Sequence, residues 1–252
     1  MYLKKEKCLI VGVSKSGFSV CCFLLERGAK CFVYDDAETD EVKSAERDLS
    51  ERGATVVYKS EINELLGEIT MVVLSPGVAI DHDIPVRARK LGKRIIGELE
   101  LASEFCISPI VAVTGTNGKT TTCSMINDIL KSGGVKSVLC GNVGTPFSSV
   151  LDKLGYDSVA VAEVSSFQLE TTARFTPHIA VVTNITPDHL SRHYNMENYI
   201  YLKSKLLSNL RESEYAVLNY DDKIVRNFSE KTKGQPDLRP ASPCDVFTGA
   251  FL

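Results

Sequence analysis

The stretch Pro109–Thr122 constrains the fold of this 252-residue chain more than any other part of the sequence. It begins with a short apolar run, Ile110–Val113, typical of a buried parallel strand, and two glycines, Gly115 and Gly118, end that run. A helix-compatible segment, Thr120–Ser132, follows. This order of strand, glycine loop and helix predicts a phosphate-binding loop, because glycines let backbone N–H groups approach an anion and a helix N-terminus adds partial positive charge.

Two side chains of this loop have the chemistry that a bound nucleoside triphosphate requires. In a loop of this kind Lys119 reaches the outer phosphates, and the hydroxyl group of Thr120 binds Mg²⁺. The match is imperfect, because the strict Walker pattern has a glycine at the position of Val113. The alternative is an ordinary strand-to-helix turn with a surface lysine, but Gly-Lys-Thr directly after an apolar strand favours phosphate binding.

Composition and charge are those of an ordinary globular protein. The chain is 44% hydrophobic and 24% charged, and its net charge of −3 with no long basic run gives no sign of a nucleic-acid partner. No apolar run approaches the roughly 20 residues that span a bilayer, and the N-terminus lacks a signal-peptide core, so we expect a cytoplasmic protein without a membrane partner. The eight cysteines form no C-x-x-C pair, so we expect reduced, mostly buried thiols.

The N-terminal part of the chain alternates short apolar runs with helix-compatible segments, which predicts βαβ units and a small parallel sheet. The loop after the first run reads Gly12-x-Ser14-x-x-Gly17, a variant of the dinucleotide-binding fingerprint without its middle glycine. Asp35 follows the second run near the spacing of a ribose or base contact, and Ser75-Pro-Gly77 follows a later run, where ligands of open α/β sheets bind. The alternative is a Rossmann-like unit in which these glycines serve only packing, and it stays open.

In the C-terminal part, polar side chains follow predicted strands at their carboxyl ends. Glu163 follows one strand, Asp188 and His189 follow another, and Asn142 lies in the turn after a third. Because these strand ends lie along one edge of a doubly wound sheet, we expect the side chains to converge with Lys119. A lone carboxylate or histidine after a strand is usually a cap or a surface residue, so the functional hypothesis rests on the convergence.

The predicted helix over 197–210 places a lysine on its apolar face. At 100° per residue, Lys203 lies near the middle of a stripe whose other members are Tyr199, Leu206, Leu207 and Leu210. A charged lysine is costly to bury, so helix geometry favours an amine that snorkels to water. The alternative is a desolvated amine, which can take up CO₂ as a carbamate and then offer oxygen ligands to a hard cation.

These patterns predict an α/β fold with two consecutive domains and a tail. We expect a Rossmann-like domain over residues 1–107, a phosphate-loop domain over 108–230 and an irregular tail over 231–252, where Pro236, Pro240 and Pro243 oppose regular structure. Strands are predicted at 8–13, 30–34, 55–58, 71–74, 94–96, 110–113, 137–140, 158–162, 179–183 and 215–218. Helices are predicted up to residue 25 after the first loop and at 41–52, 84–91, 97–105, 120–132 and 197–210.

Several motifs resemble those of the Mur ligase family. The segment 114–120 is similar to the ATP loop of Mur ligases and folylpolyglutamate synthases. Four motifs resemble one branch of the Mur ligases: Gly141-Asn-Val-Gly144, Glu163-Val-Ser-Ser-Phe-Gln-Leu-Glu170, Asn184-Ile-Thr-Pro-Asp-His-Leu190 and Tyr199-x-x-x-Lys203. The resemblance extends over residues 7–222. It implies an ATP-dependent, amide-forming ligase of peptidoglycan precursor synthesis that uses an acyl-phosphate intermediate and joins D-glutamate to UDP-N-acetylmuramoyl-L-alanine. We expect a monomer.

The resemblance also implies a role for each motif residue. It implies catalytic roles for Lys119, His189 and Lys203, one Mg²⁺ held by Thr120 and Glu163, and a second held by His189 and a carbamylated Lys203. The residues implied to bind ATP are Gly115, Thr116, Asn117, Gly118, Lys119, Thr120 and Thr121. The residues implied to bind the UDP-linked substrate are Ser14, Lys15, Ser16, Asp35, Ser75 and Gly77, with Asn142 near the reacting end.

The family pattern implies a longer central domain and a third, Rossmann-like domain with the adenine contacts and D-glutamate recognition. Because the sequence after residue 234 does not match the expected continuation, we expect the central domain to be incomplete and the C-terminal domain to be absent. Two hypotheses stay open: an ATP-dependent ligase, and a non-catalytic remnant that binds only the UDP-sugar or the ATP phosphates. A third hypothesis is a folylpolyglutamate synthase. The run Ser165–Leu169 and the separate N-terminal domain for a UDP-linked substrate argue against it.

Overall fold

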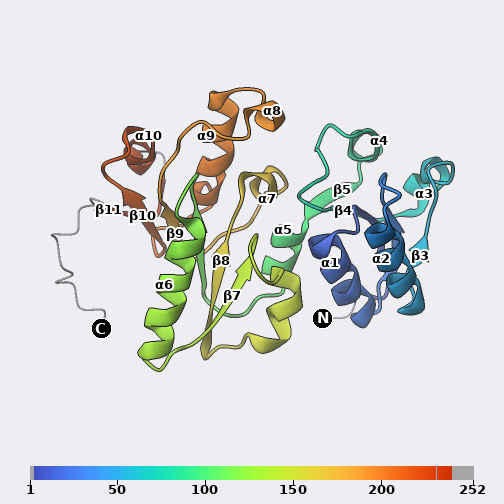
Figure 1. Ribbon diagram of the computed structural model, residues 1–252, viewed down its shortest axis with the longest axis horizontal. Helices are drawn as coiled ribbons and strands as arrows, with labels where there is room; N and C mark the ends of the chain where they lie inside the picture. Colours follow the sequence, from blue (N-terminus) through green and yellow to red (C-terminus); the bar gives the residue numbers. More distant parts are fainter. Residues whose placement is uncertain (1–2, 231, 240–252) are drawn as a thin grey trace.

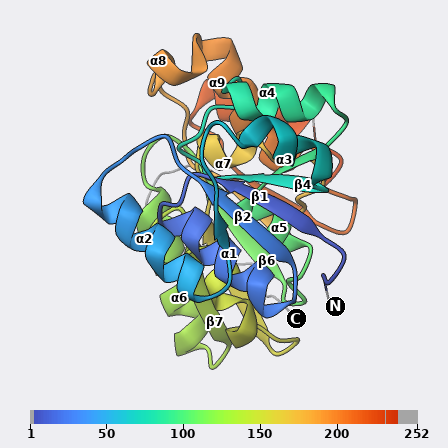
Figure 2. The ribbon, with the colours of Figure 1, turned by 90° about the vertical axis from the view of Figure 1, so that its right-hand side faces the viewer.

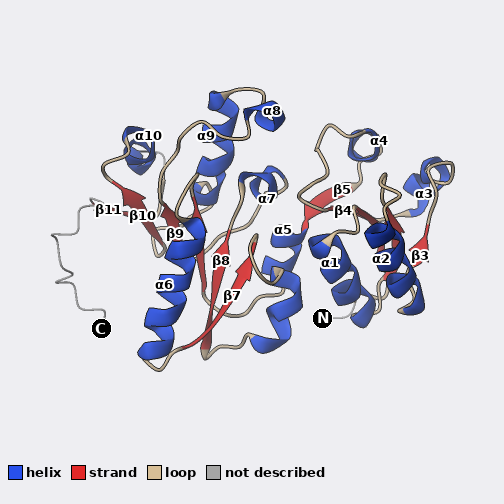
Figure 3. Cartoon of the chain, in the orientation of Figure 1, coloured by secondary structure: helices blue, strands red, loops and turns tan. Residues whose placement is uncertain are grey.

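The computed structural model describes residues 3–230 and 232–239 and contains two parallel β-sheets, one after the other along the chain (Figures 1 and 3). The first sheet consists of β1 (Lys7–Val11), β2 (Lys30–Tyr34), β3 (Thr55–Val56), β4 (Met71–Leu74) and β5 (Arg94–Gly97), in the order β3-β2-β1-β4-β5. Its helices are α1 (Lys15–Glu26), α2 (Asp40–Glu51), α3 (Ile62–Glu68), α4 (Asp83–Lys90) and α5 (Glu98–Ser103). The α/β prediction is confirmed.

Helices cover both faces of the first sheet, because both sets of alternate residues along its strands are apolar (Figure 2). In β1, Cys8 and Ile10 pack in the same cluster as Leu24 of α1 and Leu49 of α2. Leu9 and its neighbours on the other face pack with residues of α3 and α4. The near-continuous apolar runs of the sequence therefore form central strands of a doubly wound sheet.

The second sheet carries the predicted phosphate-binding loop. It consists of β6 (Ile110–Thr114), β7 (Lys136–Gly141), β8 (Ser158–Glu163), β9 (Ile179–Val182), β10 (Tyr215–Asn219) and β11 (Gln235–Arg239), in the order β11-β10-β9-β6-β8-β7. Its helices are α6 (Lys119–Ser132), η1 (Phe147–Lys153), α7 (Ser166–Glu170), α8 (Leu190–His193), α9 (Met196–Ser204), η2 (Lys205–Leu207), α10 (Lys223–Arg226) and η3 (Asn227–Glu230). In this order β7 and β8 lie on one side of β6, and β9, β10 and β11 lie on the other. The strand order therefore reverses at β6, and ligands of such sheets bind at the carboxyl ends of the strands beside this reversal.

The prediction of an irregular tail over 231–252 is wrong at Gln235–Arg239, which form the edge strand β11. The backbone N–H of Gln235 donates to the carbonyl of Glu214, and successive N–H groups of a strand point in alternate directions. Position 236 therefore faces away from β10, where the missing N–H group of Pro236 costs no ladder hydrogen bond. Residue 231 and residues 240–252 lie outside the described residues. The sequence patterns also missed α3 and η1, and the long helix expected over 197–210 is divided into α9 and η2.

Two buried glutamates of α5 attach the first sheet to the second. The carboxylate of Glu100 accepts hydrogen bonds from the backbone N–H groups of Ala173, Arg174 and Phe175, at 3.0, 2.7 and 2.9 Å. Oε1 of Glu98 accepts one from the N–H of Ser148 at 2.6 Å, and burial raises the pKa of Glu98. Within the described part of the chain, no helix combines the length and apolarity needed to cross a membrane.

Candidate active site

The loop between β6 and α6 is held against the end of β9. The backbone N–H groups of Thr116 and Asn117 donate to the backbone and side-chain oxygens of Asn184, at 2.8 and 2.9 Å. Gly115 leaves no room for a side chain, because a Cβ atom there would lie 1.9 Å from Oγ1 of Thr183. Gly118 has φ +83° immediately before α6 begins. These constraints leave the first turn of a 14-residue helix facing the edge of the sheet.

Side chains that follow three strands, β6, β7 and β8, meet at this edge. Oγ1 of Thr120 donates to Oε2 of Glu163 at 2.7 Å, and Nδ2 of Asn142 donates to Oε1 of the same carboxylate at 3.0 Å. The ammonium group of Lys119 donates to the carbonyl of Thr116 at 2.8 Å, so it lies folded back over the loop. Glu163 is therefore the centre of a polar cluster built by β6, β7 and β8.

A cavity of about 130 Å³ lies beside this cluster. The residues that line it are Lys119, Asn142, Ser165, Ser166, Phe167, Asp188, His189, Tyr199 and Lys203. Five of them were predicted from the sequence, Lys119, Asn142, His189 and Lys203 as site residues and Asp188 as a side chain that converges with them. Ser166 lies in the motif that follows β8, but nothing in the sequence distinguishes it from its neighbours there.

Lys203 does not snorkel to water, contrary to the expectation from helix geometry. The residue is 2% exposed, its Nζ donates to the carbonyl of Gly115 at 2.7 Å, and it lies 4.8 Å from the ring centroid of Tyr199. Burial and then the charge of Lys119 lower the pKa of Lys203 to about 7, although the carboxylates of Asp188 and Glu163 act in the opposite direction. Helix periodicity located the residue, but only packing against the loop shows that its amine is desolvated.

Replacing Lys203 by methionine is expected to remove a pH dependence of stability. The ordinary lysine pKa is 10.5, so between pH 7 and this value the unfolded chain binds more protons than the folded chain, and the free energy of unfolding rises with pH. From pH 7 to pH 9 the wild-type chain should gain about 2 kcal/mol relative to Lys203→Met. Urea unfolding in metal- and bicarbonate-free buffer measures this gain, and a difference that is constant with pH would contradict a desolvated amine.

Two histidines lie near the cavity in different environments. His189 is half-exposed, and its Nε2 lies 3.3 Å from a carboxylate oxygen of Asp188. His193 is buried, its Nε2 shares a hydrogen bond with the hydroxyl group of Ser166 at 2.9 Å, and burial lowers its pKa. The ring of Phe167 lies between them, with centroid distances of 5.0 and 5.1 Å. His193 carried no recognisable motif signal, whereas His189 followed a predicted strand.

The predicted residues of the first sheet lie outside this cavity. Oδ2 of Asp35 accepts a hydrogen bond from the N–H of Val13 at 2.8 Å, and the hydroxyl group of Ser75 donates to the carbonyl of Gly12 at 2.8 Å. These two side chains fix the loop before α1. Lys15 donates to the carbonyl of Gly144, so it reaches the turn that also contains Asn142. Ser14 precedes α1, Ser16 lies in its first turn, and the carbonyl of Gly77 accepts from Arg192 at 3.3 Å.

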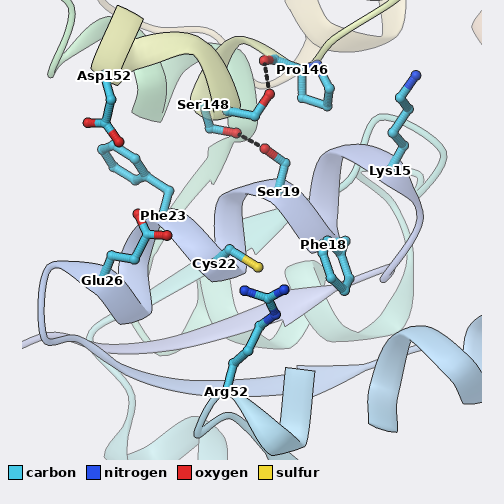
Figure 4. Close-up of a pocket in the computed structure, with 11 residues that line it drawn as sticks. Lys15, Phe18, Ser19, Cys22, Phe23, Glu26, Arg52, Pro146, Ser148 and Asp152 are labelled. Carbon is cyan, nitrogen blue, oxygen red and sulfur yellow. Dashed lines mark hydrogen bonds between the residues drawn. The ribbon is translucent and has the colours of Figure 1, made fainter. Parts of the chain in front are cut away.

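A larger groove of about 350 Å³ lies between α1 and η1 (Figure 4). Of the predicted site residues only Lys15 lines it. The hydroxyl groups of Ser19 and Ser148 meet across the groove at 2.7 Å, and Arg52 points toward Cys22 (Figure 4). The groove is therefore separate from the cluster around Glu163.

The donor set at Thr120 and Glu163 fits a magnesium ion. Both offer oxygen, and Mg²⁺ in nucleotide sites takes few protein ligands and fills its other positions with water and phosphate. No group of three or more His, Cys, Asp or Glu side chains that could hold a metal ion occurs in residues 3–230 and 232–239, so a site made wholly of such side chains is not available there. The pair His189 and Lys203 offers a nitrogen and an amine, which fit Mg²⁺ only if the amine carries a carboxylate-like group.

Comparison with known proteins agrees with this geometry. Residues 113–238 match the Mur ligase middle domain, and residues 6–97 match the Mur ligase MurD-like N-terminal domain. The chain is 41% identical to the UDP-N-acetylmuramoylalanine--D-glutamate ligase of Caldicellulosiruptor saccharolyticus, with 100% of this chain and 56% of that protein covered. The ligase of the same name from Caldanaerobacter subterraneus is 39% identical, with coverages of 93% and 52%.

Solved structures show the same fold. A crystal structure of UDP-N-acetylmuramate:L-alanyl-gamma-D-glutamyl-meso-diaminopimelate ligase from Neisseria meningitides has a TM-score of 0.62 at 16% identity, covering 92% of this chain and 77% of that one. That of UDP-N-acetylmuramate-alanine ligase from Thermotoga maritima has a TM-score of 0.53 at 22% identity, covering 88% and 51%. The chain spans about half the length of the curated relatives named above. From the two domain matches, the chain belongs to the Mur ligase family.

Proposed function

We propose that this chain is the part of an ATP-dependent ligase that binds ATP and UDP-N-acetylmuramoyl-L-alanine, to which the enzyme adds D-glutamate. The observation that carries the proposal is the convergence of Lys119, Thr120, Asn142 and Glu163 at the carboxyl edge of the second sheet. The relatives at about 40% identity, named for this reaction, support the choice of substrates. We further propose a cytoplasmic monomer with the UDP-linked substrate bound by residues 1–107 and ATP by residues 108–230.

The reaction needs positioning and charge neutralisation more than covalent help from the protein. The substrate carboxylate attacks the γ-phosphate of ATP, which gives an acyl phosphate and ADP, and the amine of D-glutamate then displaces phosphate. Lys119, freed from the carbonyl of Thr116, turns to the β- and γ-phosphates, while the N–H groups at the start of α6 face the same anion. Asn142 orients the reacting end of the substrate. Thr120 and Glu163 would hold Mg²⁺, which would neutralise charge on the phosphates.

We propose that the neutral amine of Lys203 adds to CO₂ and releases a proton, which gives a carbamate; with His189, this carbamate would hold a second Mg²⁺. Its low pKa supplies the neutral amine that this reaction requires, and its position 2.7 Å from the carbonyl of Gly115 places it under the phosphate-binding loop. With ¹³C-bicarbonate we expect one protein carbamate signal in ¹³C NMR spectra of the wild-type chain. The Lys203→Met variant should lack that signal, and an equal signal in both proteins would overturn carbamylation at this residue.

Phosphate release by the purified chain tests the proposed function. The assay contains ATP, Mg²⁺, bicarbonate, UDP-N-acetylmuramoyl-L-alanine and D-glutamate. Release that requires both the UDP-linked substrate and D-glutamate supports a ligase, and Lys119→Ala should lower it at least about tenfold because the outer phosphates lose their cation. Binding of neither ATP nor the UDP-linked substrate would overturn the proposal.

A second candidate is binding of the two substrates without ligation. This chain covers 56% and 52% of the length of the two relatives, and this partial coverage supports the second candidate. Calorimetric binding of ATP and of the UDP-linked substrate without phosphate release would support this candidate over the ligase.

A further inference from the structure

Arg192 and Glu170 form an ion pair, and neither residue lines the cavity beside Glu163. Glu170 is the last residue of α7, and Arg192 lies in the single turn α8. Nη2 of Arg192 donates to Oε2 of Glu170 at 2.7 Å, and Nε donates to Oε1 at 3.3 Å. The two hydrogen bonds make the pair two-pronged, and its carboxylate is shielded from water, because the side chain of Glu170 is 6% exposed whereas that of Arg192 is 24% exposed.

The same guanidinium group also contacts the first sheet. Nη1 donates to the carbonyl of Gly77 at 3.3 Å, and Nη2 donates to that of Val78 at 3.1 Å. These carbonyls belong to the loop after β4, which includes Ser75. Tyr194, two residues after Arg192, donates to the carboxylate of Asp81 in the continuation of this loop. Glu170 therefore orients a guanidinium group that joins the two halves of the chain.

The turn that carries Arg192 is held in a strained backbone conformation. His189 immediately before α8 has φ +51°, and Tyr194 immediately after it has φ +67°, and both are residues other than glycine. Such conformations persist only where the surroundings fix them. On the inner side this is done by His193, which bonds to Ser166 and packs on Phe167. On the outer side Arg192 bonds to the carbonyls of Gly77 and Val78, and Tyr194 bonds to Asp81.

We propose that Arg192, oriented by Glu170, is a positioning residue that fixes the Gly77–Val78 loop relative to His189. The proposal rests on the proposed function: the UDP-linked substrate binds at the loops of the first sheet and ATP at the second, and Arg192 sets the distance between them. A planar guanidinium group suits this role, because it can satisfy two carboxylate oxygens and two carbonyls at once, whereas a lysine cannot. Binding of one substrate should then favour binding of the other.

Hydrogen–deuterium exchange of the complete chain without ligands tests the contact itself. In Arg192→Ala we expect amides of residues 75–82 and 188–194 to exchange at least about tenfold faster than in the wild type, with β1 and β6 unchanged. Arg192→Lys and Glu170→Gln keep more of the packing and should give smaller increases in the same two segments. The matched control is Lys136→Ala, which breaks an exposed ion pair with Asp157 and should leave both segments unchanged.

Wild-type exchange rates in residues 75–82 of both Arg192→Lys and Glu170→Gln would overturn the proposal, even if Arg192→Ala fails to fold. The second measurement is the affinity for ATP with and without UDP-N-acetylmuramoyl-L-alanine. We expect the UDP-linked substrate to tighten ATP binding about tenfold in the wild type and about twofold or less in Arg192→Lys. Equal tightening in both proteins, or none in a wild type that binds both ligands, would also overturn it. If the wild type binds neither ligand, the proposed function is overturned. The hydrogen–deuterium exchange without ligands then still tests whether Arg192 fixes the Gly77–Val78 loop.

Discussion

Replacing Glu100 by alanine is expected to lower the free energy of unfolding by about 3–5 kcal/mol. The carboxylate accepts three hydrogen bonds from consecutive backbone N–H groups, and the residue is 2% exposed. Truncation removes the buried carboxylate that these three donors share, leaves the N–H group of the buried residue Phe175 without this partner, and breaks a link between α5 and the segment after α7. Equilibrium urea unfolding, followed by circular dichroism at pH 7, measures the change.

Two variants of the same helix region control this prediction. Glu104 pairs with Arg94 on the surface, where the two side chains are 31% and 47% exposed, so Glu104→Ala should cost less than about 1 kcal/mol. Glu100→Gln retains one acceptor oxygen and should fall between the two alanine variants. If Glu100→Ala and Glu104→Ala have equal stabilities, the three short hydrogen bonds do not hold the two sheets together.

Much of the fold could be predicted from local sequence, because each buried parallel strand is an apolar run bounded by turn residues. The strands β2 and β4 begin and end at the predicted residues. The edge strand β11 could not be predicted, since only pairing with β10 defines it and its proline argued against a strand. The short helices α3 and η1 are too brief for periodicity to be distinctive.

The candidate site was predictable where topology decides it and not where packing decides it. Parallel strands bring their carboxyl ends to one edge, so the meeting of Glu163 with Thr120 and Asn142 follows from the strand order. The burial of Lys203 depends on the loop that covers its helix, and the sequence does not show this loop's position. The hydrogen bonds of Asp35 and Ser75 could not be predicted either, because their partners are backbone groups of the loop before α1, which is distant from them in the sequence.

Replacing Glu163 by glutamine is expected to weaken Mg²⁺-dependent ATP binding at least about 100-fold while leaving the fold intact. Mg²⁺ prefers charged oxygen ligands, and an amide in place of the carboxylate removes the negative charge beside Thr120. Glutamine has nearly the same shape, its oxygen can still accept from Asn142, and the Thr120 hydroxyl group can reverse its role and accept from the new amide. Calorimetric titration of ATP at several Mg²⁺ concentrations measures the effect, with thermal unfolding as the test of the fold.

The Mg²⁺ dependence separates metal binding by Glu163 from a purely structural role. If the carboxylate is a metal ligand, Glu163→Gln should shift the Mg²⁺ concentration at which ATP binding is half-maximal, whereas ATP binding in the presence of a chelator should be nearly unchanged. If the carboxylate only fixes Thr120 and Asn142, ATP affinity should fall by the same factor with and without Mg²⁺. Asp157→Asn, which also exchanges a carboxylate for an amide but in an exposed ion pair with Lys136, should behave as the wild type in both conditions. An unchanged Mg²⁺ midpoint in Glu163→Gln would therefore contradict the assignment of this carboxylate to the metal.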